Sequence, residues 1–368
     1  MLTDKHIVTT AVSSVAEMAT VTGFTRLQTL ALLPVPDHPR VPLAHQLAGD
    51  DVPTIRLDVR PLGGDKRAAM LTWTPAGAVQ HPRALQIRLQ RSYPGRVRAG
   101  APVPTRSMPT VEVRANLEWF TAASTRGRPV DSVVLSGVGA ASRPDLSELA
   151  AYARERGIRR ITLHAGVEDL DGLSADRIAV DTLVLPLQVG ESGANLAAAA
   201  RVLGAARAAG LTTVATTQLV SSALASLGGA VQVALATGVG SMTLSYPFPI
   251  DGAASGDAPP PARVLSVLRD VVPRLQEGGV CVAIRGLPAC LLGEFAALGG
   301  KTGNRWYVDA DHQLGKALLF FPDVVAFHKG DECRFCSLNE RCDGWFATYL
   351  RRPAFGRLRA VEAALPPS

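Results

Sequence analysis

The 368-residue chain has no cysteine before position 281, and only 5% of its residues are aromatic. No apolar run is long enough to cross a bilayer, which argues against a membrane protein. The N-terminus lacks the basic and then apolar order of a signal peptide. With few side chains that could stack on bases, nucleic-acid binding is not expected either. We therefore expect a cytoplasmic globular protein whose thiols stay reduced.

The cysteines that are present gather near the C-terminus. Three of them form a tight group, Cys333, Cys336 and Cys342. A Cys-x2-Cys step places two thiolates on one turn, where both can point at a single centre, and Gly344 lets the chain turn away after the third. Cys290 is the best candidate for a fourth ligand, with Cys281 as its competitor. The spacing predicts a metal site; the alternative is a set of buried free thiols.

The spacing of these cysteines bears on which metal they bind. Structural zinc sites usually pair two short knuckles, whereas this chain has one knuckle, a five-residue step and a remote ligand. Iron–sulfur clusters accept such uneven spacing. We therefore predict a [4Fe–4S] cluster, with zinc as the alternative. Trp345 and Phe346 follow the last ligand and are expected to shield the site from solvent.

From residue 84 onward, apolar strand-like runs alternate with amphipathic helical stretches. The strand candidates are 84–89, 132–136, 160–164, 182–189, 212–217 and 241–246. The helix candidates are 111–123, 144–156, 194–209, 221–237 and 261–276, and Ser142 with Asp145 is a plausible helix start. Six strands alternating with helices predict an α/β fold with parallel strands, either an open barrel, which we favour, or a flat doubly wound sheet. The reactive face is expected where strands end and helices begin.

Three segments are expected along the chain. Residues 1–82 carry short alternating runs and predict a small β-rich segment. Residues 83–279 form the barrel. Residues 280–368 leave the helical rhythm and form a C-terminal cysteine module.

Over about residues 84–360 the chain resembles the radical SAM superfamily, in particular members with a C-terminal auxiliary iron–sulfur module of the SPASM or twitch type. The stretch 136–146 lies where that family carries Gly-Gly-Glu-Pro-Thr and a helix start like Pro144-Asp145-Leu146. The tail, with Cys290 and then Cys-x2-Cys-x5-Cys-Asp-Gly, is similar to the family's auxiliary-cluster tail. The resemblance implies a partial (β/α)6 barrel and a cluster held by the four thiolates.

The motifs that define the family's chemistry are missing. Members bind their catalytic cluster with Cys-x3-Cys-x2-Cys after the first strand, where this chain has residues 90–98 without a cysteine. A vestigial S-adenosylmethionine site remains at Gly137, Val138 and Gly139, with no glutamate for the methionine amine. His164-Ala165-Gly166 replaces a common Thr-Asn-Gly. We expect neither S-adenosylmethionine cleavage nor binding, as in a pseudoenzyme.

Arginines replace the missing cysteine loop. Residues 83–111 contain six arginines and no acidic residue. Arg91, Arg96 and Arg98 are candidates for binding a phosphate or carboxylate at the barrel mouth, where His164 could move protons. The alternative is a solvated basic loop.

Three functions follow from these motifs. The first is a non-catalytic partner or scaffold for an active radical SAM enzyme, or a protein that presents a bound substrate or peptide to one. The second is an enzyme with non-radical chemistry on a small anionic substrate at the arginine-lined mouth. The third is an interaction module stapled by zinc.

Overall fold

A computed structural model gives the fold of most of the chain. It describes residues 83–92, 105–122, 129–137, 139–166, 179–187, 194–247, 257–300, 305–310, 312–314, 317–320, 329–350 and 352–362. It also gives the backbone of four N-terminal strands, β1 (Ile7–Val8), β2 (Ala44–Leu47), β3 (Pro53–Val59) and β4 (Ala69–Trp73). No helix in these ranges is both long and apolar enough to cross a membrane.

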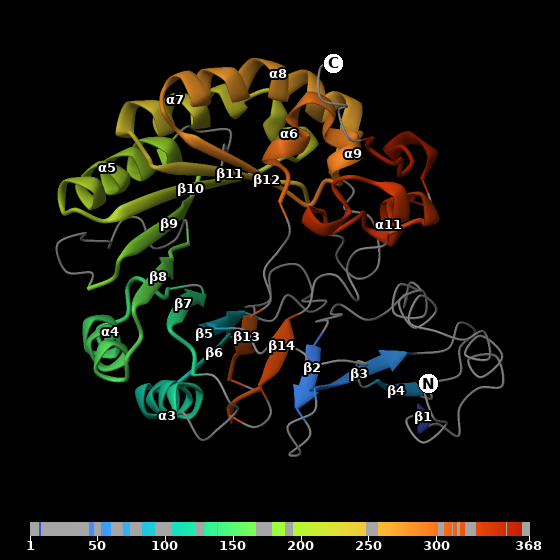
Figure 1. Ribbon diagram of the computed structural model, residues 1–368. Coiled ribbons are helices and arrows are strands. Elements are labelled where there is room, and N and C mark those ends of the chain that lie inside the picture. The colour runs from blue at the N-terminus through green and yellow to red at the C-terminus, as the bar shows by residue number, and fades with distance from the viewer. Residues whose placement is uncertain are drawn as a thin grey trace, which may run out of the picture.

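The centre of the fold is a sheet of parallel strands that curves into an arc (Figure 1). In spatial order, its parallel strands are β13 (Arg305–Val308), β5 (Ala84–Ser92), β7 (Ser132–Gly137), β8 (Arg160–His164), β9 (Thr182–Pro186), β10 (Thr212–Gln218), β11 (Ser241–Ser245) and β12 (Cys281–Arg285). Every neighbouring pair in this series is parallel. The predicted α/β class and the partial barrel of parallel strands are therefore confirmed.

Helices cover the outer side of the arc, as expected for right-handed crossovers between parallel strands (Figure 1). They are α3 (Thr110–Thr121), α4 (Leu146–Glu155), α5 (Ala194–Ala208), α7 (Leu227–Thr237) and α8 (Pro261–Glu277), with the short α6 (Ser221–Leu224) before α7. The predicted helix over 221–237 is thus two helices, because the chain leaves helical geometry at Ser226, whose ψ is 4°.

The sheet has eight parallel strands among the described residues, two more than the six predicted. The extra strands, β12 and β13, come from the stretch assigned to the C-terminal module. β12 continues the sheet after β11, and β13 returns to the opposite side and pairs with β5. The domain boundary at residue 280 stays a prediction, but the hydrogen-bonded sheet runs across it.

The antiparallel strands lie at the β13 side of the arc. β14 (Leu318–Phe320) pairs with β13 and with β2, and β2 continues into β3, β4 and β1. A short strand, β6 (Thr105–Ser107), pairs with the end of β5. The N-terminal strands thereby extend the same sheet rather than stand apart from it.

Buried and more exposed residues alternate along the parallel strands, so that one face of the sheet is buried under the helices and the other is not. Leu85, Ile87, Leu163 and Leu244 are fully buried in the core shared with the helices. At the β13 end, Trp306 packs against Phe120 of α3, with ring centroids 5.4 Å apart. Since successive side chains of a strand point to opposite faces, the residues between these positions lie on the inner, concave face.

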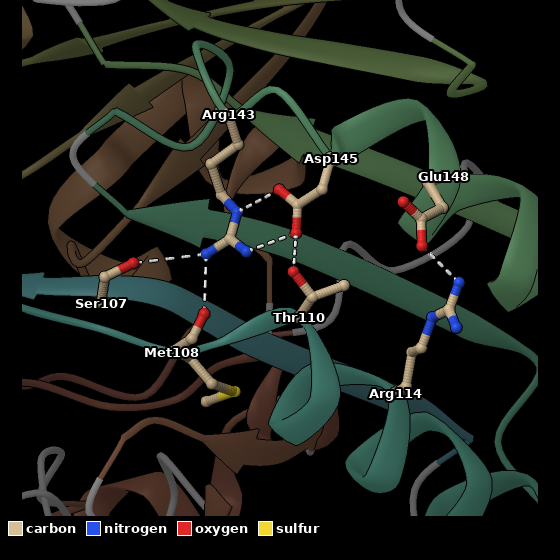
Figure 2. A network of polar contacts seen from close by, with 7 residues as sticks. All are labelled: Ser107, Met108, Thr110, Arg114, Arg143, Asp145 and Glu148. Carbon is tan, nitrogen blue, oxygen red and sulfur yellow. Dashed lines mark hydrogen bonds and ion pairs between the residues drawn. The ribbon is translucent and has the colours of Figure 1, made fainter.

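A polar network fixes the start of α4 next to α3 (Figure 2). Arg143 binds the carboxylate of Asp145 through Nε at 2.8 Å and Nη2 at 2.6 Å, and its Nη1 donates to the carbonyl of Met108. Thr110 donates to the same carboxylate. The predicted helix start at Ser142 is wrong: Asp145 occupies the N-cap, and its side chain binds Arg143 and Thr110 instead of the helix amides.

Asp145→Asn is expected to lower stability by about 1–2 kcal/mol at pH 7, because it breaks a partly buried, bidentate ion pair. Hydrogen bonds from Arg143 hold the pKa of the Asp145 carboxyl below its usual range. This stabilisation is therefore fully present at pH values above the unfolded-state pKa of an aspartate, about 3.9. It is lost as the pH falls through the lower pKa that Asp145 has in the folded state. Urea unfolding at several pH values measures both effects.

Asp270→Asn is the matched control, since Asp270 forms an exposed ion pair with Arg274 on α8. It should change stability by less than about 0.5 kcal/mol. Equal effects of the two substitutions at pH 7 would contradict a structural role for the Arg143 network.

Candidate metal centre

Four cysteine side chains line one pocket in the C-terminal part of the chain. The pocket has about 280 Å³ of empty space, counting the part that opens to solvent. Its cysteines are the four predicted ligands, Cys290, Cys333, Cys336 and Cys342. Cys281, the competitor for the fourth position, is exposed at the start of β12 and is not part of the pocket lining. The four thiols thus line one pocket, and their role as metal ligands stays a prediction.

Short helical turns position these cysteines. Cys290 lies in α9 (Ala289–Leu292), which begins after Pro288. Cys333 lies in the 3₁₀ helix Asp331–Phe335, and the N–H of Cys336 donates to its carbonyl at 3.2 Å, so the Cys-x2-Cys step forms one turn as predicted. Cys342 follows a second 3₁₀ helix, Asn339–Arg341. Gly344 then has φ 97°, a conformation that favours glycine, and turns the chain away.

Backbone amides point at the sulfur atoms. The N–H groups of Gly344 and Ala289 donate to Sγ of Cys342, at 3.3 and 3.5 Å, and the N–H of Val361 donates to Sγ of Cys336 at 3.4 Å. A backbone hydrogen bond from Arg359 reaches Cys290. Such donors stabilise sulfur in its anionic form, and they set the reduction potential when thiolates bind iron.

The electrostatics of the pocket oppose four free thiolates. Burial raises the pKa of Cys290, and the negative charges of the three other thiolates raise it further. Burial also raises the pKa of Cys333, although the nearby Lys329 acts in the other direction. Four thiolates in one partly buried pocket therefore need a bound cation or metal cluster to offset their repulsion.

The donor set fits a metal centre in its chemistry: four sulfur ligands, amide donors to sulfur and a partly buried wall. Among the residues that the structure describes, however, no group of three or more His, Cys, Asp or Glu side chains is drawn together as around a single ion. The choice between an iron–sulfur cluster and zinc stays a prediction.

An aromatic cluster joins the cysteine region to the barrel. Trp345 and Tyr349 are fully buried, and each ring lies 5.3 Å from the ring of Tyr246, just beyond β11. The Tyr349 hydroxyl donates to the carbonyl of Pro247 at 2.8 Å. Phe346 is buried beside Trp345. These rings pack the turn that follows Cys342 against the end of the sheet.

At Gly137 and Gly139, where a vestigial S-adenosylmethionine site was predicted, the chain packs tightly on β5. Gly137 has φ 124°, and a Cβ there would lie 2.5 Å from the carbonyl oxygen of Gln90. A Cβ at Gly139 would lie 3.0 Å from the Gln90 side chain. Val138 lies outside the described residues. Gln90 of β5 thus lies against both glycines.

The predicted anion-binding arginines are only partly described. The backbone of Arg91 belongs to β5 and pairs with Arg106 of β6, whereas Arg96 and Arg98 lie outside the described residues. Their role stays a prediction.

His164 ends β8 on the inner face of the sheet. It keeps solvent access but is surrounded by protein atoms, and this desolvation, together with the charge of Arg305, lowers its pKa to about 4. The imidazole is therefore neutral at pH 7. Arg305 and Gln86, its inner-face neighbours, were missed by the sequence analysis. The alternation of polar residues with buried apolar ones in β5 and β13 is the signal that could have found them.

No family model matches the chain, and neither does any curated protein. Among solved structures, SuiB of Streptococcus suis bound to S-adenosylmethionine is similar with a TM-score of 0.48 and 11% identity, over 75% of this chain and 76% of that one. Native anSMEcpe with bound AdoMet is similar with a TM-score of 0.48 and 10% identity, over 74% of this chain and 95% of that one. Triosephosphate isomerase of Bartonella henselae has a TM-score of 0.33 and 13% identity, over 64% and 94%.

Proposed function

We propose that this chain is a radical-SAM-like protein that binds one [4Fe–4S] cluster through Cys290, Cys333, Cys336 and Cys342 and has lost S-adenosylmethionine chemistry. It acts as a non-catalytic partner or scaffold that presents a substrate to an active radical SAM enzyme. The observation that carries the cluster proposal is the shared pocket of the four cysteines, with backbone N–H groups directed at their sulfur atoms.

A bound cluster would supply a one-electron redox centre. The chain's own residues do the rest. The cysteines hold the centre, and the amides of Gly344 and Val361 stabilise their sulfur atoms. The buried Trp345 packs the turn after Cys342 against the end of the barrel.

The loss of S-adenosylmethionine chemistry is supported by the strands on the far side of the arc. No cysteine precedes position 281, so no thiolate can hold a catalytic cluster beyond β5. The glycines that remain, Gly137 and Gly139, contact Gln90 closely. A protein that keeps a metal centre but lacks the catalytic one is suited to electron relay or substrate presentation rather than to starting radical chemistry.

Titration with S-adenosylmethionine tests this proposal. Calorimetry on protein purified without oxygen should give no saturable heat at ligand concentrations up to the millimolar range. Without a catalytic iron, the amino and carboxylate groups of the ligand lack their metal anchor. Saturable binding with a dissociation constant in the micromolar range would overturn the pseudoenzyme assignment and leave the metal centre untouched.

A further inference from the structure

The inner face of the sheet carries positive charge. The inner-face positions of the described parallel strands hold arginines at 88, 160, 285 and 305, and no aspartate or glutamate. Neutral polar residues fill most of the rest, among them Gln86, Ser136, Thr162, Thr216 and Thr243. A sheet face of this composition, backed by a mostly apolar opposite face, attracts anions.

A chain of hydrogen bonds crosses the strands at one end of this face. Arg305 Nε donates to Gln86 Oε1 at 2.6 Å, and Gln86 Nε2 donates to the Ser136 hydroxyl at 3.2 Å. These three residues belong to β13, β5 and β7, which are neighbours in the sheet. Gln86 thereby holds the Arg305 side chain in a fixed orientation across the face.

Two further groups adjoin this chain. Arg88 lies directly opposite Ser136 in the register of β5 and β7 and shares the face of Gln86. His164 ends the next strand, β8, close enough to Arg305 to feel its charge. Four neighbouring strands therefore contribute polar side chains to one area of the inner face.

We propose that this area binds a small organic anion, bearing a phosphate or carboxylate group, between the guanidinium groups of Arg305 and Arg88, with Gln86, Ser136 and His164 as hydrogen-bonding neighbours. Guanidinium groups bind both kinds of oxyanion through paired N–H donors. The neutral His164 imidazole can donate a further hydrogen bond without adding charge. The threonine hydroxyls along the neighbouring strands suit a polar body for the ligand rather than an apolar one.

The protein atoms around Arg305 strengthen its attraction for an anion. Burial lowers the pKa of the Arg305 guanidinium, which indicates a poorly hydrated cation, although it remains charged at pH 7. A charge that has already lost much of its water gives up little more when an anion arrives, and its attraction is weakly screened. The site lies on β13, β5, β7 and β8, so it does not depend on whether the cysteine pocket holds metal.

The test uses the full chain in low-salt buffer, titrated calorimetrically with inorganic phosphate and, separately, with succinate. We expect saturable binding of at least one probe at millimolar concentration. Arg305→Met and Arg88→Met should each weaken it about tenfold or more, as for the loss of a charge-assisted hydrogen bond. Arg305→Lys keeps the charge without the planar fork and should fall in between.

Arg269→Met is the matched control, because Arg269 is an exposed arginine of α8 that pairs with Glu294. It removes the same charge and should leave the affinity unchanged. Circular dichroism and thermal unfolding establish that each variant is folded. If Arg305→Met does not fold, Arg88→Met provides the test of the site. Phosphate binding alone identifies a phosphate-bearing ligand and succinate binding alone a carboxylate. Absence of binding for both probes, or equal affinities of wild type and the folded variants, would overturn the proposal.

Discussion

Cys336→Ser is expected to reduce the iron content of protein purified without oxygen from about four atoms per chain to nearly none. Serine keeps the size of the side chain but loses the thiolate, and the remaining three thiols cannot complete a four-sulfur ligand set. The substitution also removes the sulfur to which the amide of Val361 donates. Iron and acid-labile sulfide analysis of the purified variant measures the loss.

Cys281→Ser is the control for this experiment. Cys281 is exposed at the start of β12 and is not part of the lining of the cysteine pocket. Its substitution should leave iron and sulfide unchanged. If Cys281→Ser removed the iron and Cys290→Ser did not, the assignment of the fourth ligand would be wrong.

Trp345→Ala is expected to destabilise the protein by about 3–5 kcal/mol, the usual cost of deleting a large aromatic side chain from a core. Trp345 is fully buried, and its ring lies 5.3 Å from both Tyr246 and Tyr349. The substitution would leave a cavity where the cysteine region packs against the end of β11. Urea unfolding of metal-free protein measures the change without a contribution from metal binding.

Trp345→Phe separates packing from polarity. The indole N–H of Trp345 has no hydrogen-bond acceptor among the described residues, so its removal should cost nothing by itself. We expect a loss of less than about half of that caused by alanine, from reduced volume alone. Equal losses for the two variants would mean that the ring does not contribute through packing.

Local periodicity was sufficient for most of the barrel. The strand predicted over 160–164 is β8 without change, and the helix predicted over 194–209 ends one residue earlier in the structure. β8 alternates clearly between buried apolar and exposed or half-buried polar residues, and the helix is a long alanine-rich run. The pairing of β13 with β5 could not be predicted in the same way, because it joins residues more than 200 positions apart through backbone hydrogen bonds.

In the candidate sites, too, local features could be predicted from the sequence and contacts between distant segments could not. The cysteine group was visible because ligand spacing within a turn is a local property, as Cys333 and Cys336 illustrate. The donors to their sulfur atoms come from distant backbone, such as Val361, and any residue type can supply an N–H. The contact between Arg305 and Gln86 likewise depends on strand order, which no local pattern encodes.

The most direct test of the central claim is metal analysis, with an absorption spectrum, of the wild-type chain purified without oxygen. We expect about four iron atoms per chain, a matching amount of acid-labile sulfide and a broad band in the visible. One zinc per chain and a colourless solution would contradict it. The cysteines would then form a structural staple, and the proposed anion site on the inner face would become the better guide to function.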